Sequence, residues 1–136
     1  MQRIDGHVHL EHGPLSAAYV EQFVAAAQKA GLDCLQILDH THRFREFRPA
    51  YQSVIDADPR QAQWLSGKGK FKDSLTDYLE LVRQLKQRAW PLEVRFGLEV
   101  CYTPESELFL RDICRELPLD FLVGSVHSID GLLYDM

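Results

Sequence analysis

The stretch Asp5-Gly6-His7-Val8-His9-Leu10-Glu11-His12 holds three histidines and two carboxylates within eight residues. Side chains alternate between the two faces of a β-strand, so a strand over residues 2–9 would carry Asp5, His7 and His9 on one face. A strand that only packs against a core has no need of so many metal-binding side chains. The stretch is therefore predicted to supply one strand's share of a metal site.

Three more strands are predicted along the chain, each after a helix. The clearest is Cys34-Leu35-Gln36-Ile37-Leu38, a short apolar run typical of a strand buried in a parallel sheet. Caps and breakers such as Ser16, Gly31 and Pro91 mark the ends of the helices. The predicted helices cover residues 14–30, 74–89 and 103–116, and the predicted strands cover residues 2–9, 34–38, 92–100 and 121–126.

Residues 43–72 show the least regular pattern in the chain, with aromatic side chains set among charges and two prolines. We expect a long functional loop with short helical pieces, because structureless connections of this length in compact domains are usually functional.

The alternation of strand and helix predicts an α/β fold with parallel strands, since short crossovers place the helices outside the sheet. Polar side chains fall at the predicted carboxyl ends of the strands, where active sites of this fold class form. No histidine occurs between Arg43 and Val126, and all six lie at these strand ends or in the turns after them. The candidate ligands at the strand ends are His7, His9, His40, Glu99 and His127.

The composition of the 136-residue chain limits the classes of function. A hydrophobic content of 46% is enough for one ordinary core, while a net charge of -5 without a basic run offers nothing general to nucleic acids. Three cysteines without a C-x-x-C spacing indicate neither a disulfide framework nor a thiolate zinc site. With no export signal and no long apolar run, we expect a cytoplasmic protein without a membrane partner.

The mixture of imidazoles and one carboxylate suits zinc, iron or manganese, and a carboxylate such as Glu99 can bridge two cations. More than four candidate ligands predict more than one ion, so we expect two to three divalent metal ions. Ions a few ångströms apart can hold a bridging hydroxide as a nucleophile and stabilise the leaving oxygen of a phosphate ester. Hydrolysis of a phosphate ester is the predicted chemistry.

Four motifs in this order resemble those of the polymerase and histidinol phosphatase (PHP) family, particularly its histidinol-phosphatase-like branch. The motifs are Asp5-Gly6-His7-Val8-His9, Asp39-His40, Gly97-Leu98-Glu99 and Gly124-Ser125-Val126-His127. The resemblance implies a distorted, TIM-like barrel of seven strands with three metals. Residues 1–136 would then form a PHP-type domain that is incomplete at its C-terminus, the front half of the barrel.

The resemblance also implies how the ligands are divided. His7 and His9 would bind one metal, and Glu99 would bridge it to a second metal that His127 serves. His40 would hold the third metal with a histidine soon after the first motif, for which His12 is the candidate. A further histidine and a late Asp-x-His motif have no counterpart here. We therefore expect a longer protein, or two copies that cover each other's exposed strand edges.

Other polar residues are expected to support the ligands. Asp5 and Asp39 are predicted to orient histidines, although Asp39 could instead cap the following turn. Arg43 and Arg45 follow His40 closely and are candidates for binding phosphate, with a solvated loop as the alternative. His42 is expected to be a loop residue or a donor behind the ligands.

The predicted function is metal-dependent hydrolysis of a small phosphomonoester. The resemblance suggests L-histidinol phosphate, cleaved to L-histidinol and phosphate in histidine biosynthesis. One alternative is a nuclease of the kind found in polymerase-linked relatives, which the acidic balance disfavours. Another is a metal-binding fragment without catalytic activity.

Overall fold

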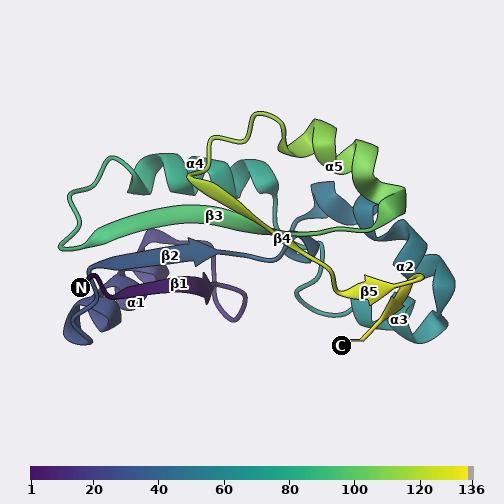
Figure 1. The fold of residues 1–136 in the computed structure, drawn as a ribbon, viewed down its shortest axis with the longest axis horizontal. Coiled ribbons are helices and arrows are strands. Elements are labelled where there is room, and N and C mark those ends of the chain that lie inside the picture. Colours follow the sequence, from purple (N-terminus) through teal and green to yellow (C-terminus); the bar gives the residue numbers. More distant parts are fainter. Residues whose placement is uncertain (135–136) are drawn as a thin grey trace.

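Four parallel strands form the main sheet of the computed structural model, which describes residues 1–134. Their order in the sheet equals their order in the chain, and Figure 1 shows them as a curved ribbon of neighbours. The strands are β1 (Ile4–His9), β2 (Cys34–Leu38), β3 (Glu93–Cys101) and β4 (Phe121–Ser125). This arrangement confirms the α/β fold with parallel strands that alternate with helices.

Helices connect the strands. α1 (Ala17–Lys29) begins where the Ser16 hydroxyl accepts a hydrogen bond from the Tyr19 amide, and it ends before Gly31, which has a φ of 71°. Tyr78 of α4 (Leu75–Leu85) donates to the Gly97 carbonyl of β3, which fixes α4 beside the sheet (Figure 1). α5 (Glu107–Cys114) follows a 3-10 turn over Pro104–Ser106 and leads to β4.

The segment predicted to be a long loop with short helical pieces does contain such pieces, and they make up most of it. It contains 3-10 turns over Thr41–Arg43 and Arg45–Tyr51, followed by α2 (Gln52–Ala57) and α3 (Pro59–Leu65). Each piece is too short for a clear helical period, but Phe44, Phe47 and Tyr51 are buried and anchor the segment in the core. Figure 1 shows α2 and α3 beyond the carboxyl ends of β1 and β2.

Several predicted boundaries differ from the structure, the ends of α4 and β3 among them. α4 ends at Leu85, whose carbonyl accepts from the Trp90 indole at 3.0 Å and from the Arg88 amide at 3.1 Å, so the chain turns before residue 89. β3 extends to Cys101, which places Glu99 within a strand and not at its end.

A hairpin of β5 (Ser128–Ile129) and β6 (Leu132–Leu133) was not predicted. Its two-residue loop, Asp130 and Gly131, has φ values of 50° and 76°. An Asp-Gly pair between apolar residues favours this kind of hairpin, so the sequence did contain the pattern. Gln61 holds the hairpin by donating to the Gly131 carbonyl and accepting from the Leu133 amide.

β1 contains an irregularity that changes which side chains share a face. Asp5 lies opposite Leu35 and Val8 opposite Ile37, so three steps along β1 match two along β2. Asp5 and Val8 consequently line the same cavity against α1. The expectation that Asp5 shares a face with His7 and His9 by simple alternation is therefore wrong.

Apolar side chains are exposed on β4, just after it and on the hairpin. β1 and β4 are the outer strands of the main sheet. Leu122, Val126, Ile129 and Leu132 are 44% to 65% exposed. Within residues 1–134, none of the helices combines the length and the apolarity needed to cross a bilayer.

Candidate metal centre

The register of the sheet places polar residues of β1 and β3, and those just after β2, side by side, near the carboxyl ends of β1 and β2. His9 pairs with Leu38 at the end of β1 and β2. One step further, the Glu99 amide donates to the Asp39 carbonyl at 2.9 Å, and His40 and Glu99 form an isolated parallel bridge. Glu99 thus lies beside the ends of β1 and β2, with β4 on its other side.

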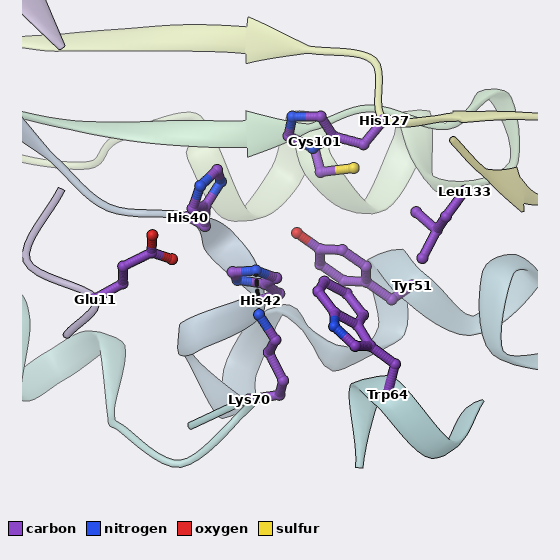
Figure 2. Close-up of a pocket in the computed structure, with 9 residues that line it drawn as sticks. All are labelled: Glu11, His40, His42, Tyr51, Trp64, Lys70, Cys101, His127 and Leu133. Atoms are coloured by element: carbon purple, nitrogen blue, oxygen red, sulfur yellow. Dashed lines mark hydrogen bonds between the residues drawn. The ribbon is translucent and has the colours of Figure 1, made fainter. Parts of the chain in front are cut away.

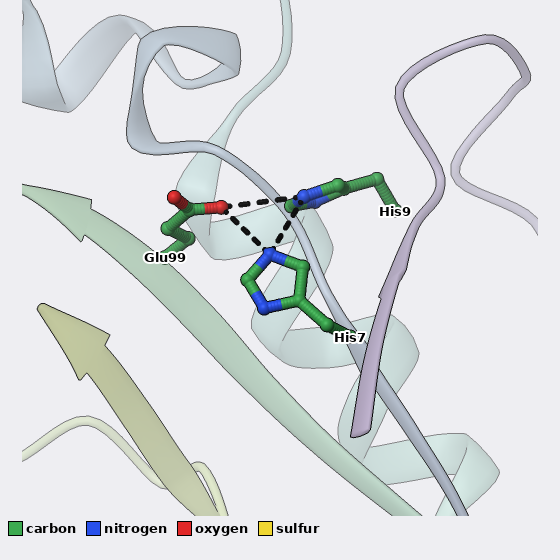
Figure 3. Close-up of side chains that lie close together, drawn as sticks. All are labelled: His7, His9 and Glu99. Atoms are coloured by element: carbon green, nitrogen blue, oxygen red, sulfur yellow. Dashed lines mark hydrogen bonds and ion pairs between the residues drawn. The ribbon is translucent and has the colours of Figure 1, made fainter. Parts of the chain in front are cut away.

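Three ligand atoms form a nearly equilateral triangle (Figure 3). The Nε2 atoms of His7 and His9 are 3.0 Å apart, and they lie 3.1 Å and 3.2 Å from Glu99 Oε2. An imidazole nitrogen carries either one proton or one lone pair, so hydrogen bonds cannot satisfy all three contacts at once. A cation close to the triangle would satisfy all three atoms.

A second group meets the same carboxylate. His40 Nδ1 lies 3.3 Å from Glu99 Oε2, and His127 Nε2 lies 3.3 Å from Glu99 Oε1. The rings of His9 and His40 are stacked with centroids 4.2 Å apart, which joins the two groups. Glu99 therefore belongs to both trios of candidate ligands and is placed to bridge two ions.

The charge states of these groups suit a cation. Burial raises the pKa of Glu99, but the surrounding imidazoles, His40 first, outweigh it and lower the pKa below its ordinary value. Burial lowers the pKa of His40 and outweighs the opposing effect of Glu99. An anionic carboxylate and a neutral imidazole are the forms that bind metal.

The donor set fits a divalent transition metal. Ligands about 2.1 Å from a tetrahedral zinc ion lie about 3.4 Å from one another, close to the separations around Glu99. His9 Nδ1 is buried and has no hydrogen-bond partner among the described residues. Bound ligands of this kind usually donate from their second nitrogen to a carboxylate or carbonyl, so the surroundings of His9 depart from that pattern.

His12 does not join the cluster. Its side chain is 89% exposed, and its nearest charged partner is Glu11, at 3.6 Å. A turn that begins at buried Leu10, whose carbonyl accepts from the Gly13 amide, directs His12 outward. Glu11 instead lines the cavity beside His40 and was not singled out from the sequence, because alternation stops at His9.

Arg43 stabilises the fold and does not line the cavity. Its guanidinium donates to the carboxylates of Asp39 and Asp73 and to the carbonyls of Leu10 and Gly13, over distances of 2.6 to 2.8 Å. The side chain is 3% exposed, so its donors are not available to a phosphate. Arg45 is exposed and does not line the cavity. The structure thus places neither arginine where it was expected.

The two aspartates do not hold imidazoles by hydrogen bonds within residues 1–134. Asp5 accepts only from the His7 backbone amide, at 3.4 Å. Asp39 is fully buried and accepts from Arg43 at 2.7 Å. Burial raises the pKa of Asp39 to about 6 against the opposing charge of Arg43.

A cavity of about 210 Å³ lies next to the second trio (Figure 2). His40 and His127 stand on one side of it, and side chains of the segment after β2 stand on the other. Several of these side chains were not predicted from the sequence, because the segment has no regular pattern. The lining residues are Glu11, His40, His42, Tyr51, Trp64, Lys70, Cys101, His127 and Leu133.

Comparison with known proteins gives two matches. The family model described as "PHP domain" matches residues 5–135. A protein of Deinococcus radiodurans described as "Probable histidinol-phosphatase" is 26% identical over 132 residues, which cover 96% of this chain. The chain spans 44% of the length of that relative.

Proposed function

The chain belongs to the PHP domain family, and we propose that it takes part in the metal-dependent hydrolysis of a small phosphomonoester. The observation that carries this proposal is the crowding of imidazole nitrogens around one carboxylate. Three lie within 3.3 Å of Glu99 Oε2, and a fourth lies 3.3 Å from Oε1. Protein hydrogen bonds alone do not explain this arrangement.

The candidate ligands would bind two cations. His7 and His9 would hold one divalent cation with Glu99, and His40 and His127 would hold another with the same carboxylate. Cations bound there would supply the charge that polarises a phosphate ester and activates water. Glu99 would fix the spacing of the two groups, because β3 lies inside the sheet and its backbone pairs on both sides.

The substrate we propose is L-histidinol phosphate, which would place the protein in histidine biosynthesis. The name of the Deinococcus radiodurans relative supports this choice. The cavity is smaller than the roughly 300–1,000 Å³ of sites for drug-sized ligands, and it carries aromatic rings that suit a flat imidazole. Its rings come from His42, Tyr51 and Trp64.

The barrel would be completed outside the described residues. The rest of a longer protein or a second copy would cover the open edges of β1 and β4, which lie on opposite sides of the sheet, and the exposed apolar side chains of β4 and the hairpin. A third metal would take its remaining ligands from that source. The small substrate and this covering segment are the partners we propose, in the cytoplasm.

The test measures metal content and hydrolysis on one batch. Wild type, E99Q and the control E93Q, which lies at the exposed far end of the same strand, are assayed with histidinol phosphate, p-nitrophenyl phosphate and 3'-end-labelled DNA. We expect metal and phosphomonoesterase activity in wild type and E93Q, and neither in E99Q. Cleavage of DNA alone would favour the nuclease, and bound metal without any turnover would favour a non-catalytic metal-binding module.

A further inference from the structure

Lys70 occupies the wall of the cavity that lies across from the candidate ligands (Figure 2). Its ammonium nitrogen is 2.8 Å from His42 Nε2 and 4.0 Å from the centre of the Trp64 ring. An ammonium group only donates hydrogen bonds, so His42 Nε2 accepts and the proton of this imidazole resides on Nδ1. Lys70 is therefore held in place by a neutral ring and an aromatic face.

The positive charge of Lys70 has no direct counterion. Among the described residues, no carboxylate lies within ion-pair distance of it, whereas Lys86 pairs with Asp120 and Arg43 with two aspartates. Burial lowers the pKa of Lys70 below its ordinary value, and it outweighs the opposing charge of Glu11, which lines the same cavity. A cation that is positioned but unpaired beside a cluster of candidate metal ligands leaves room for an anionic ligand.

The contacts of His42 show that the lysine is positioned by its surroundings. The His42 ring lies 5.6 Å from Trp64 and 6.2 Å from Tyr51, centre to centre. Groups fixed in this way bind a ligand without first losing conformational freedom.

We propose that Lys70 binds a non-bridging oxygen of the substrate phosphate, the role that the sequence suggested for Arg43 or Arg45. The proposal rests on the proposed function, because it is the ions near His40 and His127 that would hold the other phosphate oxygens. A lysine suits this task as a compact point charge. Glu11 lines the same cavity and would repel the phosphate. The combined positive charges of Lys70 and the ions would outweigh this repulsion.

The experiment measures binding of inorganic phosphate to protein loaded with Mn²⁺ and freed of excess metal. The variants are K70M, K70R and the control K72M, which removes the same charge from an exposed neighbour on the same segment. Titration calorimetry gives the phosphate affinity, elemental analysis the metal content, and thermal unfolding the integrity of the fold. Rates with p-nitrophenyl phosphate are recorded in parallel.

We expect K70M to weaken phosphate binding about 10- to 100-fold, the range for one charge-assisted hydrogen bond, with an unchanged metal content. K70R should retain part of the affinity, and K72M all of it. In the rate assay, K70M should raise KM more than it lowers kcat.

Each outcome separates the role of Lys70 from the proposed function. Equal phosphate affinity in K70M and wild type overturns the role of Lys70, even if hydrolysis continues. Metal-loaded wild type that binds no phosphate overturns it as well. Phosphate binding that depends on Lys70, without hydrolysis by any variant, supports the site and contradicts the esterase function.

Discussion

Two polar clusters lie at the same end of the sheet, one around Arg43 and one around Glu99. They differ in how far hydrogen bonds within the protein satisfy their polar groups. In the Arg43 cluster, one buried cation donates to two carboxylates and two carbonyls, which uses its guanidinium donors within the fold. Among the described residues, Asp39 Oδ1 has no hydrogen-bond partner, but Asp39 Oδ2 accepts from Arg43. In the Glu99 cluster, four imidazole nitrogens surround one carboxylate, and hydrogen bonds cannot satisfy all the contacts.

The difference between the two clusters separates structural from functional polar groups. Buried polar groups are nearly always paired, so a cluster in which each charged side chain finds an opposite charge within the protein holds the fold together. A cluster that lacks a partner points to a ligand. Residue type alone does not separate them, since Asp39 and His40 are neighbours in the chain but belong to different clusters.

The largest expected effect is a loss of protein stability when the Arg43 cluster is broken. R43M leaves Asp39 buried without its cation, and we expect a loss of about 3–5 kcal/mol in the free energy of unfolding. Urea titration measures the loss, and R45M, at an exposed site, should stay within about 0.5 kcal/mol of wild type. A stable R43M that fails to bind phosphate would return Arg43 to the substrate site.

The next effect concerns the Glu99 cluster and should appear in metal affinity. E99Q removes the shared negative charge, so we expect the affinity for Mn²⁺ or Zn²⁺ to fall at least about 100-fold, which is about 2.7 kcal/mol. Competition with a chelating dye measures it. The metal-free protein should keep its stability, because the cluster contributes little to the fold without an ion. Unchanged metal affinity in E99Q, with lost stability, would make the cluster structural.

A smaller effect comes from protonation of Asp39. Its pKa is raised from 3.8 to about 6, so between these values the folded state binds a proton that the unfolded state has released. The contribution of Asp39 to stability is therefore greatest at low pH and declines as the pH rises through 6. The stability of wild type relative to D39N should fall by about 1–3 kcal/mol from pH 4 to pH 6.5. A rise over this range would show that Arg43 dominates the pKa of Asp39.

The smallest expected effect is at His12. Because its side chain is 89% exposed and lies outside the cluster, H12A should change neither metal content nor stability by more than about 0.5 kcal/mol. H9A, at the end of β1, should lose metal. If H12A released an ion selectively, the turn after β1 would have to move to bring this histidine inward.

The sequence predicted the fold and the convergence of the strand ends, because both follow from local patterns and from how parallel strands pair. His7, His9, His40, Glu99 and His127 come together for that reason. The other expectations depended on contacts that no local pattern contains. The irregular pairing of β1 turned Asp5 away, and Arg43 is occupied by Asp73, thirty residues along the chain.

Lys70 is a residue that local sequence patterns could not identify as part of the site. It lies in a segment without regular periodicity, and only the placement of His42 and Trp64 around it distinguishes it from the exposed lysines nearby. Glu11 was missed because a turn, and not a strand, decides that it faces the cavity in place of His12.

The most direct test of the central claim is a crystal structure with Mn²⁺ or Zn²⁺ and an anomalous difference map. We predict a peak about 2.0–2.3 Å from His7 Nε2, His9 Nε2 and Glu99 Oε2, and a second peak shared by Glu99, His40 and His127. Occupied metal sites elsewhere, with the triangle of His7, His9 and Glu99 empty at saturating metal, would contradict the account.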